Sequence, residues 1–296
     1  DKGKKMIIVI VGPTGVGKTK LSIELAKKYN AEIINGDSMQ VYKGLDIGTA
    51  KVTESEKEGI YHHLFDICDV NSIYTVYDYQ KDCRTKIKEI EAKGKNVIIV
   101  GGTGLYIKAA LYDYRFKDEN DLNSYDNLTN EEIFAKLKKY DNNLEIHVNN
   151  RRRLVRLLNK YENNLMMENT GNNPLYKFYM IGLTTNRETL YQKIDDRVDV
   201  MLKNGLLEEV KFFYDKSIHS KSLLTGIGYK ELYSYFDNEI SYDEAINLIK
   251  KNSRHYAKRQ YTFFKHQFPN INWYNTNYDD FNKTIINICE DIEKSN

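Results

Sequence analysis

The chain has 296 residues, with 44 Lys and Arg against 42 Asp and Glu, and its formal net charge is +2. This length allows one large domain or two ordinary ones, and the near-zero charge excludes a histone-like or strongly polybasic protein. No stretch approaches 18 uninterrupted apolar residues, so the sequence also excludes a membrane-spanning helix. A local basic surface stays open, because net charge does not say where the charges lie.

The cysteines and the start of the chain bear on the compartment. Cys68, Cys83 and Cys289 are odd in number, lie far apart and form no CxxC pair, which is typical of free thiols in a reducing compartment. The apolar run at residues 6–11 is shorter than the core of a secretory signal. We therefore expect a cytoplasmic protein with no membrane partner, and we expect it to be a monomer.

The first part of the chain alternates between strands and helices. Short apolar runs predict strands, and apolar residues at helical spacing predict helices. In chain order, the expected elements are a strand at residues 5–11, a helix ending near residue 29, a strand at 31–35, a helix at 74–92, a strand at 96–100 and a helix starting near residue 105. This alternation predicts an α/β fold with a doubly wound, mostly parallel sheet flanked by helices.

The composition changes after about residue 116. Residues 118–174 are rich in Asn and charged residues and carry two helical patterns, so we expect a small all-helical insertion there. Strand character returns at residues 178–183, and four helical patterns follow at 187–204, 206–215, 228–236 and 242–267. The expected catalytic core is therefore discontinuous, formed by residues 1–117 and 175–296.

A glycine-rich segment follows the first strand directly and precedes a helix directly. It reads Gly12, Pro13, Thr14, Gly15, Val16, Gly17, Lys18, Thr19 and satisfies the P-loop pattern GxxxxGK[ST] in the strand–loop–helix context that supports it. The glycines let backbone N–H groups and the helix N-terminus converge on phosphate oxygens. Lys18 adds a positive charge, and the Thr19 hydroxyl is a ligand for Mg²⁺. The segment predicts phosphate binding without naming the phosphate compound.

Polar side chains follow the second strand. Asp37, Ser38 and Gln40 lie at its carboxyl end, where doubly wound sheets bind ligands. An Asp there can bind metal, accept a proton or hold a substrate amine, and it can equally be a helix N-cap. The sequence alone leaves these alternatives open.

The strand at residues 96–100 is followed by Gly101, Gly102, Thr103 and Gly104 rather than by an acidic residue. A P-loop ATPase usually has a Walker-B Asp at this place to organise Mg²⁺ and the attacking water. The absence of an acid here argues against ordinary ATP hydrolysis.

Two stretches predict contact with nucleic acid. Arg152, Arg153 and Arg156 lie at helical spacing in the insertion, although a solvated helix with local ion pairs explains them equally well. Residues 246–277 contain no Asp or Glu, and six basic residues alternate there with aromatic ones. Basic side chains contact phosphates and exposed rings stack on unpaired bases, although some of these rings are expected in the core. Adjacent His62 and His63 point to opposite faces of a strand and so do not share one metal.

Seven segments together resemble the bacterial tRNA dimethylallyltransferases. They read GPTGVGKT at residues 12–19, GDSMQVYKGLDIGTAK at 36–51, HHLFDI at 62–67, VGGTGLY at 100–106, RVDVML at 197–202, IGYKEL at 227–232 and YAKRQ at 256–260. The resemblance spans nearly the whole chain in consistent order. It implies transfer of a dimethylallyl group from dimethylallyl diphosphate to N6 of adenosine 37 of tRNA, next to the anticodon on its 3′ side, giving N6-isopentenyladenosine.

The resemblance also implies roles for single residues. The P-loop would hold the diphosphate leaving group, while Lys18, Thr103, Arg197 and Mg²⁺ on Thr19 would stabilise its charge. Asp37 matches the general base that deprotonates the exocyclic amine. Without the resemblance, the sequence favours a surface ion pair between Arg197 and one of its acidic neighbours, Asp195, Asp196 or Asp199. The implied contacts with the tRNA anticodon stem-loop are Asp37, Ser38, Met39, Gln40, Thr103, Arg152, Arg153, Leu154, Val155 and Arg156.

Other functions of a P-loop protein stay open from the residues themselves. They are a kinase for a nucleotide or small metabolite, and a non-catalytic nucleotide-binding switch with ATP as a ligand. A prenyltransferase acting on free adenylate is a nearer alternative, and the arginines of the insertion favour tRNA over it.

Overall fold

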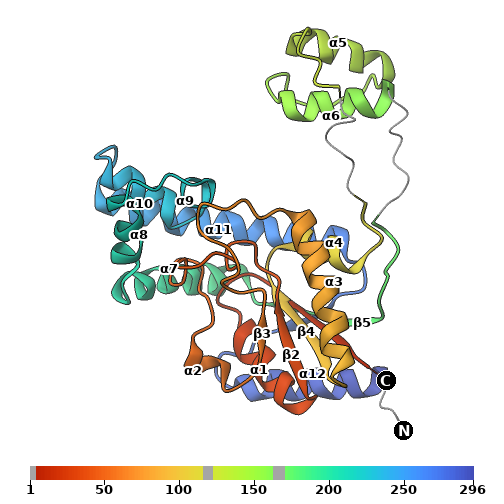
Figure 1. Cartoon of the computed structure of the whole chain (residues 1–296), viewed down its shortest axis with the longest axis vertical. Helices are drawn as coiled ribbons and strands as arrows, with labels where there is room; N and C mark the ends of the chain where they lie inside the picture. Colours follow the sequence, from red (N-terminus) through yellow and green to blue (C-terminus); the bar gives the residue numbers. More distant parts are fainter. Residues whose placement is uncertain (1–4, 116–122, 163–170) are drawn as a thin grey trace. The chain divides into compact units, whose positions relative to one another are not determined.

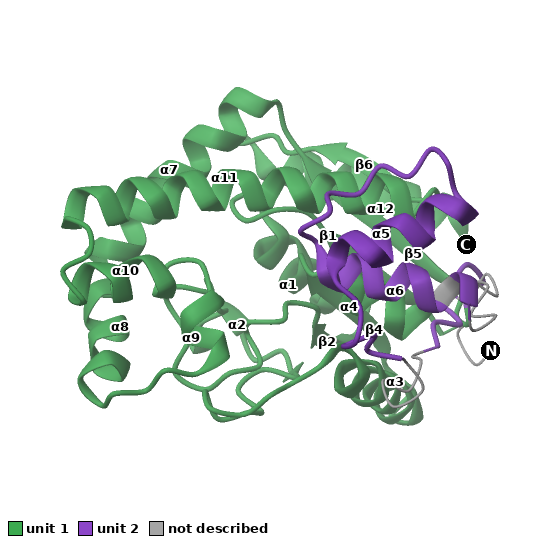
Figure 2. Ribbon diagram, turned by 90° about the horizontal axis from the view of Figure 1, so that it is seen from above, with its two compact units in different colours: residues 1–111, 175–296 green, residues 112–174 purple. Residues whose placement is uncertain are grey.

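The computed structural model describes residues 5–115, 123–162 and 171–296. The chain forms two compact units, which Figure 2 distinguishes by colour: unit 1 comprises residues 1–111 and 175–296, and unit 2 comprises residues 112–174. The boundary expected at residue 117 lies outside the described residues. Each unit has its own hydrophobic core and is described by itself.

Unit 1 is built on a six-stranded sheet in which every paired neighbour is parallel (Figure 1). The strand order is β3-β2-β4-β1-β5-β6. The strands are β1 (Ile7–Val11), β2 (Ala31–Asn35), β3 (His62–His63), β4 (Asn96–Gly101), β5 (Phe178–Thr184) and β6 (Asn272–Asn275). The predicted α/β fold with a parallel sheet flanked by helices is confirmed.

The central strands are apolar because helices cover both faces of the sheet. Every residue of β1 and β2 is buried, as expected for a parallel sheet between two helical layers. On one face, Ile8 and Ile33 pack in a core with residues of α1 (Lys18–Lys28), α7 (Arg187–Lys203) and α12 (Phe281–Ser295). On the other face, α3 (Val76–Ala92) contacts β2 and β4, and α4 (Gly104–Leu111) contacts α3.

A second core in unit 1 joins helices to the long loop after β2. Its buried members include Val41 and Leu45 of the loop and Tyr229 and Leu232 of a helix. The helices involved are the end of α7, α8 (Leu206–Asp215), α9 (Lys221–Thr225), α10 (Tyr229–Phe236) and the start of α11 (Tyr242–Gln267). This packing fixes the loop at residues 36–51, which carries Asp37, against a helical support.

The structure adds elements that the sequence did not predict. They are α2 (Glu54–Lys57), α9, β6 and α12. Strand β6 reads NWYN and has no run of apolar residues, so its strand character depends on pairing with β5. The segment lies in the acid-free stretch of residues 246–277, for which the sequence predicts contact with nucleic acid rather than a strand.

Unit 2 is a small helical unit, as the composition of residues 118–174 predicts. It contains α5 (Asn130–Tyr140) and α6 (Arg151–Glu162), and α5 begins at a capping box formed by Thr129 and Glu132. Five residues form its core: Tyr125, Ile133, Leu137, Leu154 and Leu158. Within the described ranges of both units, no helix combines the length and apolar character needed to cross a bilayer.

Candidate active site

The P-loop links β1 to α1 and is open to an anion at the helix N-terminus. Gly17 caps α1 in the left-handed region, at φ 98°, and no side chain caps the helix. The first N–H groups of α1 therefore keep their capacity to bind phosphate oxygens. A side chain at Gly12 is excluded, because its Cβ would lie 2.8 Å from the carbonyl oxygen of Leu183 in β5.

Two side chains from the segment after β6 hold the P-loop from outside. The Thr276 hydroxyl donates to the carbonyl oxygen of Val16 at 2.7 Å, and the Tyr278 hydroxyl donates to that of Gly15 at 2.9 Å. The loop is thus fixed by residues some 260 positions away. Sequence reasoning missed both contacts, because nothing local marks them.

Lys18 lies in the middle of the phosphate loop. Its Nζ donates to the carbonyl oxygens of Gly12 at 2.5 Å and of Pro13 at 3.1 Å. Burial lowers the pKa of Lys18, the carboxylate of Asp37 partly opposes this shift, and the guanidinium of Arg197 adds to it. The structure therefore brings Lys18, Asp37 and Arg197 into one electrostatic neighbourhood, although they lie on three separate elements.

Arg197 of α7 is not in the surface ion pair that its acidic neighbours suggest. Each of those acids is bound by another residue: Asp195 by Arg254 at 2.6 Å, Asp196 by Gln192 at 2.8 Å and Asp199 by Lys250 at 2.8 Å. The Nε of Arg197 is buried and has no hydrogen-bond partner among the described residues. Burial lowers the pKa of its guanidinium, and the charge of Glu56 opposes this shift. A buried donor without a partner beside Lys18 indicates a place for an anionic ligand.

Asp37 lies where β2 leaves the sheet, and it is not a helix N-cap, because residues 37–49 form turns and extended segments. The amide of Asp37 donates to Oδ1 of Asn35 at 2.9 Å, and Nδ2 of Asn35 donates back to the carbonyl oxygen of Asp37 at 2.9 Å. Its carboxylate accepts a hydrogen bond from the backbone N–H of Gly102 at 2.6 Å. The two bonds with Asn35 hold the backbone of Asp37, and the bond from Gly102 holds its carboxylate.

The loops after β2 and β4 touch through their backbones. A Cβ on Gly101 would lie 2.2 Å from the carbonyl carbon of Gly36, so only glycine fits there. The amide of Thr103 donates to the carbonyl oxygen of Gly36 at 3.1 Å, and its hydroxyl oxygen accepts from the amide of Ser38 at 2.9 Å. Thr103 is thereby placed beside Ser38 and Asp37, as the resemblance implies.

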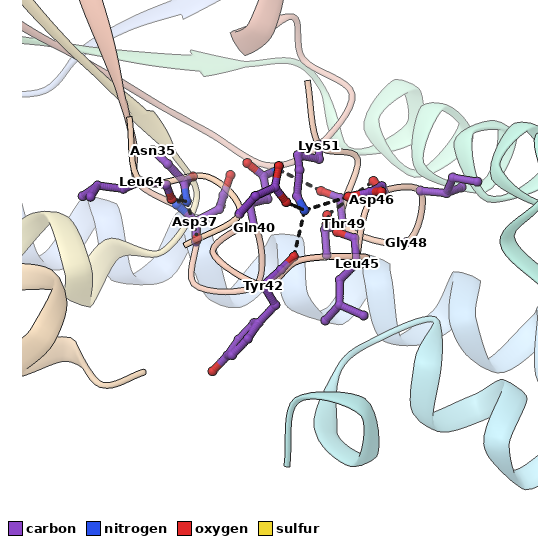
Figure 3. A network of polar contacts seen from close by, with 12 residues as sticks. Asn35, Asp37, Gln40, Tyr42, Leu45, Asp46, Gly48, Thr49, Lys51 and Leu64 are labelled. Carbon is purple, nitrogen blue, oxygen red and sulfur yellow. Dashed lines mark hydrogen bonds and ion pairs between the residues drawn. The ribbon is translucent and has the colours of Figure 1, made fainter. Parts of the chain in front are cut away.

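The rest of the loop at residues 36–51 is organised around Lys51 (Figure 3). The buried Nζ of Lys51 donates to the carbonyl oxygen of Tyr42 at 2.8 Å, to Asp46 Oδ1 at 2.8 Å and to Asp66 Oδ1 at 2.5 Å. Gln40 donates through Nε2 to the carbonyl oxygen of Thr49 at 2.8 Å. The segments at residues 36–51 and 62–67 therefore form one structure, with Asp37 at its start.

One face of helix α11 lies against the loop after β4 that contacts Asp37. The buried Gln260 donates through Nε2 to the carbonyl oxygen of Gly102 at 3.0 Å. One turn earlier in the helix, Tyr256 is partly exposed. Burial and the charge of Asp37 raise the pKa of the Tyr256 hydroxyl, and its hydrogen bonds with Thr103 and Gln260 partly offset this rise. The segment at residues 256–260 contained both residues, but no pattern in it predicted the role of Gln260.

The described residues show no group of three or more His, Cys, Asp and Glu side chains arranged to hold a metal ion. His63 instead pairs through Nε2 with Glu32 Oε1 at 2.7 Å, and Nδ1 of His62 lies 2.8 Å from the carbonyl oxygen of Ile60. The remaining candidate for a metal is Thr19, at the start of α1.

The arginines of unit 2 separate into a structural one and three exposed ones. Arg151 donates to the carbonyl oxygens of Leu128 and Tyr125 at 2.9 Å and 2.8 Å. Arg152, Arg153 and Arg156 are exposed, Val155 is partly buried and Leu154 is fully buried in the core of the unit. The surface that unit 2 offers from this stretch is therefore made by the three exposed arginines.

The acid-free stretch on α11 is only partly a free basic surface. Lys250 and Arg254 pair with acids of α7, and Phe264 is fully buried. Lys251, Lys258, Arg259 and Lys265 are exposed, and the guanidinium of Arg259 lies 5.6 Å from the ring centroid of Tyr256.

Comparisons with known proteins identify the family of the chain. The family model described as IPP transferase matches residues 40–267. A protein of Anoxybacillus flavithermus named tRNA dimethylallyltransferase is 46% identical over 97% of this chain and 96% of its own length, and one of Bacillus subtilis with the same name is 46% identical over 92% and 91%.

Solved structures show the same fold. A tRNA delta(2)-isopentenylpyrophosphate transferase from Staphylococcus epidermidis superposes with a TM-score of 0.77 at 40% identity, covering 99% of this chain and 100% of that one. A eukaryotic dimethylallyltransferase acting on tRNA superposes with a TM-score of 0.75 at 31% identity, covering 92% and 74%. The P-loop, the Asp37 loop and the partly buried Arg197 therefore lie in a chain that belongs to the IPP transferase family.

Proposed function

We propose that this chain is a tRNA dimethylallyltransferase that alkylates N6 of the adenosine on the 3′ side of the anticodon, with dimethylallyl diphosphate as donor. The observation that carries the proposal is the meeting of Lys18, Arg197 and Asp37 at the carboxyl ends of the strands. Two partly buried cations suit a departing diphosphate, and a carboxylate beside them suits a proton acceptor.

The reaction exchanges one bond for another. The C–O bond of dimethylallyl diphosphate breaks, and the electron pair leaves with the diphosphate, whose charge Lys18, Arg197 and the N–H groups of α1 stabilise. The exocyclic nitrogen of adenosine forms the new bond to the same carbon, and its proton passes to Asp37. An exocyclic amine is a weak nucleophile, so its alignment with the allylic carbon contributes as much as proton removal does.

Mg²⁺ fits this site through oxygen ligands. Mg²⁺ in such sites keeps several waters and binds few protein oxygens together with substrate phosphates, so the Thr19 hydroxyl would be its protein ligand beside the diphosphate. Bound there, Mg²⁺ would neutralise charge on the leaving diphosphate.

The proposed RNA surface includes Arg152, Arg153 and Arg156, the three exposed arginines of unit 2. Ser38, Met39 and Gln40, which follow Asp37 in its loop, and Thr103 are proposed to contact the flipped adenosine, because a base must leave its stack to reach a carboxylate held within the loops of the site. The partly exposed ring of Tyr256 is a surface on which that base can stack.

The kinase and switch alternatives have less support. The loop after β4 offers Gly101, Gly102 and Thr103 where a P-loop ATPase has an acid, and the relatives are named tRNA dimethylallyltransferase and tRNA delta(2)-isopentenylpyrophosphate transferase rather than kinase.

The test is a transfer assay. The protein is incubated with radiolabelled dimethylallyl diphosphate, Mg²⁺ and an anticodon stem-loop, and a parallel reaction contains ATP in place of the donor and nucleotides and small metabolites in place of the RNA. We expect label in the RNA and no ATP consumption. An unlabelled RNA together with ATP turnover on a small molecule would contradict the proposal and support a kinase.

A further inference from the structure

Both polar backbone groups of Gly102 are used, each by a different part of the site. Its N–H donates to Oδ1 of Asp37 at 2.6 Å, and its carbonyl oxygen accepts from Nε2 of Gln260 at 3.0 Å. Gly102 therefore connects helix α11 to the carboxylate that the proposed reaction needs.

The connection leaves no free space around it. A Cβ on Gly102 would lie 2.2 Å from Nε2 of Gln260 and 3.2 Å from Oδ1 of Asp37. A side chain at this position would therefore displace the amide of Gln260 and crowd the carboxylate of Asp37. A carboxylate and an amide packed this closely against one residue do not move independently.

The side chain of Gln260 is buried, which favours its hydrogen bond to the carbonyl oxygen of Gly102. Only 8% of it is exposed, and a buried amide costs free energy unless it is hydrogen-bonded. Helix α11 has 26 residues and packs on α7 and α4, so it is a rigid support for the Gly102 loop. Tyr256 and Gln260 are four residues apart on one helical face, and both lie beside Thr103 or Gly102.

We propose that Gln260 is a positioning residue of the transfer reaction. By holding the carbonyl oxygen of Gly102, it restrains the backbone dihedral angles of this glycine and, through them, the Gly102 N–H, which holds Oδ1 of Asp37 and leaves Oδ2 for the amine of the target adenosine. This inference rests on the proposed function, because it assigns Gln260 a role through the proposed base.

The test is a double-mutant cycle of single-turnover transfer rates. Gln260→Met keeps the length of the side chain and loses the donor, and Gln260→Asn keeps the amide but is one methylene shorter. Either change should slow transfer by about tenfold to a hundredfold, the cost of a small misplacement of a reacting group, with stem-loop affinity within about twofold of wild type. Gln267→Met, an exposed glutamine on the same helix, is the matched control and should leave the rate unchanged.

The cycle separates positioning from a merely structural effect. In an Asp37→Ala background, Gln260→Met should slow the residual transfer by less than about twofold, because the carboxylate that it orients is gone. Unchanged transfer in both Gln260 variants, or the same slowing with and without Asp37, would overturn the proposal. Absence of transfer by the wild-type protein would overturn the proposed function itself, and this inference with it.

Discussion

An arginine whose buried Nε has no partner among the described residues is the most informative single residue of this protein. Arg197 and Lys18 are both partly buried, and the pKa of each is lowered by removal from solvent and, for Lys18, by the charge of the other. Such an arrangement is unfavourable in an empty site and becomes favourable when a polyanion enters it. We take this as the physical basis for binding a diphosphate.

The first prediction concerns Arg197. Replacement Arg197→Gln should lower transfer on the order of 10²–10³-fold, because it removes one fixed donor to the leaving group. Arg187→Gln, an exposed arginine at the start of the same helix, should leave transfer within about twofold. Steady-state rates with varied dimethylallyl diphosphate measure both. Equal rates for the two variants would remove Arg197 from the diphosphate site.

The second prediction concerns Asp37. Replacement Asp37→Ala should reduce turnover by about 10²–10⁴-fold, the usual contribution of a general base, while stem-loop affinity is retained. Turnover is measured by label transfer and affinity by fluorescence anisotropy with a labelled stem-loop. Near-normal turnover in this variant would show that another group removes the proton.

At the scale of residues, the sequence predicted the parts that a local pattern marks. Lys18 and Thr19 follow from the P-loop, and Asp37 from its place after β2. The absence of an ion pair between Arg197 and its acidic neighbours was not predictable without the resemblance. It depends on Arg254 and Lys250 of α11, which bind Asp195 and Asp199 instead. Gln260 was missed for a similar reason, since its partner is a backbone carbonyl 158 residues away.

At the scale of elements, one buried carboxylate joins three segments of the sheet. Glu32 of β2 is 1% exposed and accepts hydrogen bonds from His63 of β3 at 2.7 Å, and its two oxygens lie 3.0 Å from Lys93 and 3.1 Å from Lys95 after α3. Burial alone would raise the pKa of Glu32, but the hydrogen bonds from these three residues outweigh it and lower the pKa to about 2.

The third prediction follows from this pKa. The folded-state value lies below the ordinary 4.5, so the stability that Glu32 contributes is present above pH 4.5 and is lost as the pH falls toward 2. Urea unfolding at several pH values should therefore give a steeper loss of unfolding free energy in this window for wild type than for Glu32→Gln. Parallel pH dependences in the two proteins would contradict the role of Glu32.

Prediction of the elements succeeded where burial leaves a pattern in the sequence. The runs at β1, β2 and β4 are apolar because both sheet faces are covered, and α5 and α11 begin at capping boxes. Strand β6 had no such pattern, because its residues are partly exposed at the edge of the sheet. The contacts of Thr276 and Tyr278 with the P-loop were missed together with it.

At the scale of the whole molecule, some basic residues are exposed and others are already paired with acids. The net charge of +2 conceals three exposed arginines on α6 and four exposed basic residues on α11, while the acids of α7 neutralise Lys250 and Arg254. The sequence showed where basic residues gather, but only the fold shows which of them are already paired.

The fourth prediction tests the basic surface of unit 2. The triple replacement of Arg152, Arg153 and Arg156 by Gln should weaken stem-loop binding and reduce the dependence of log K on log salt concentration by up to about three ion equivalents. Lys211→Gln, an exposed lysine of α8 paired with Asp215, is the control and should keep the salt dependence of wild type. An unaltered salt dependence in the triple variant would remove these arginines from the RNA contact surface.

The central claim is that the carboxylate of Asp37 and the cations Lys18 and Arg197 together promote the alkylation of an exocyclic amine by dimethylallyl diphosphate. The most direct measurement is nucleoside analysis of the RNA product by mass spectrometry, for a stem-loop with the target adenosine and for one with purine riboside, which lacks the amine, in its place. We expect N6-isopentenyladenosine from the first RNA and no alkylated nucleoside from the second. Alkylation of the second RNA, or of any other position in the first, would contradict the account.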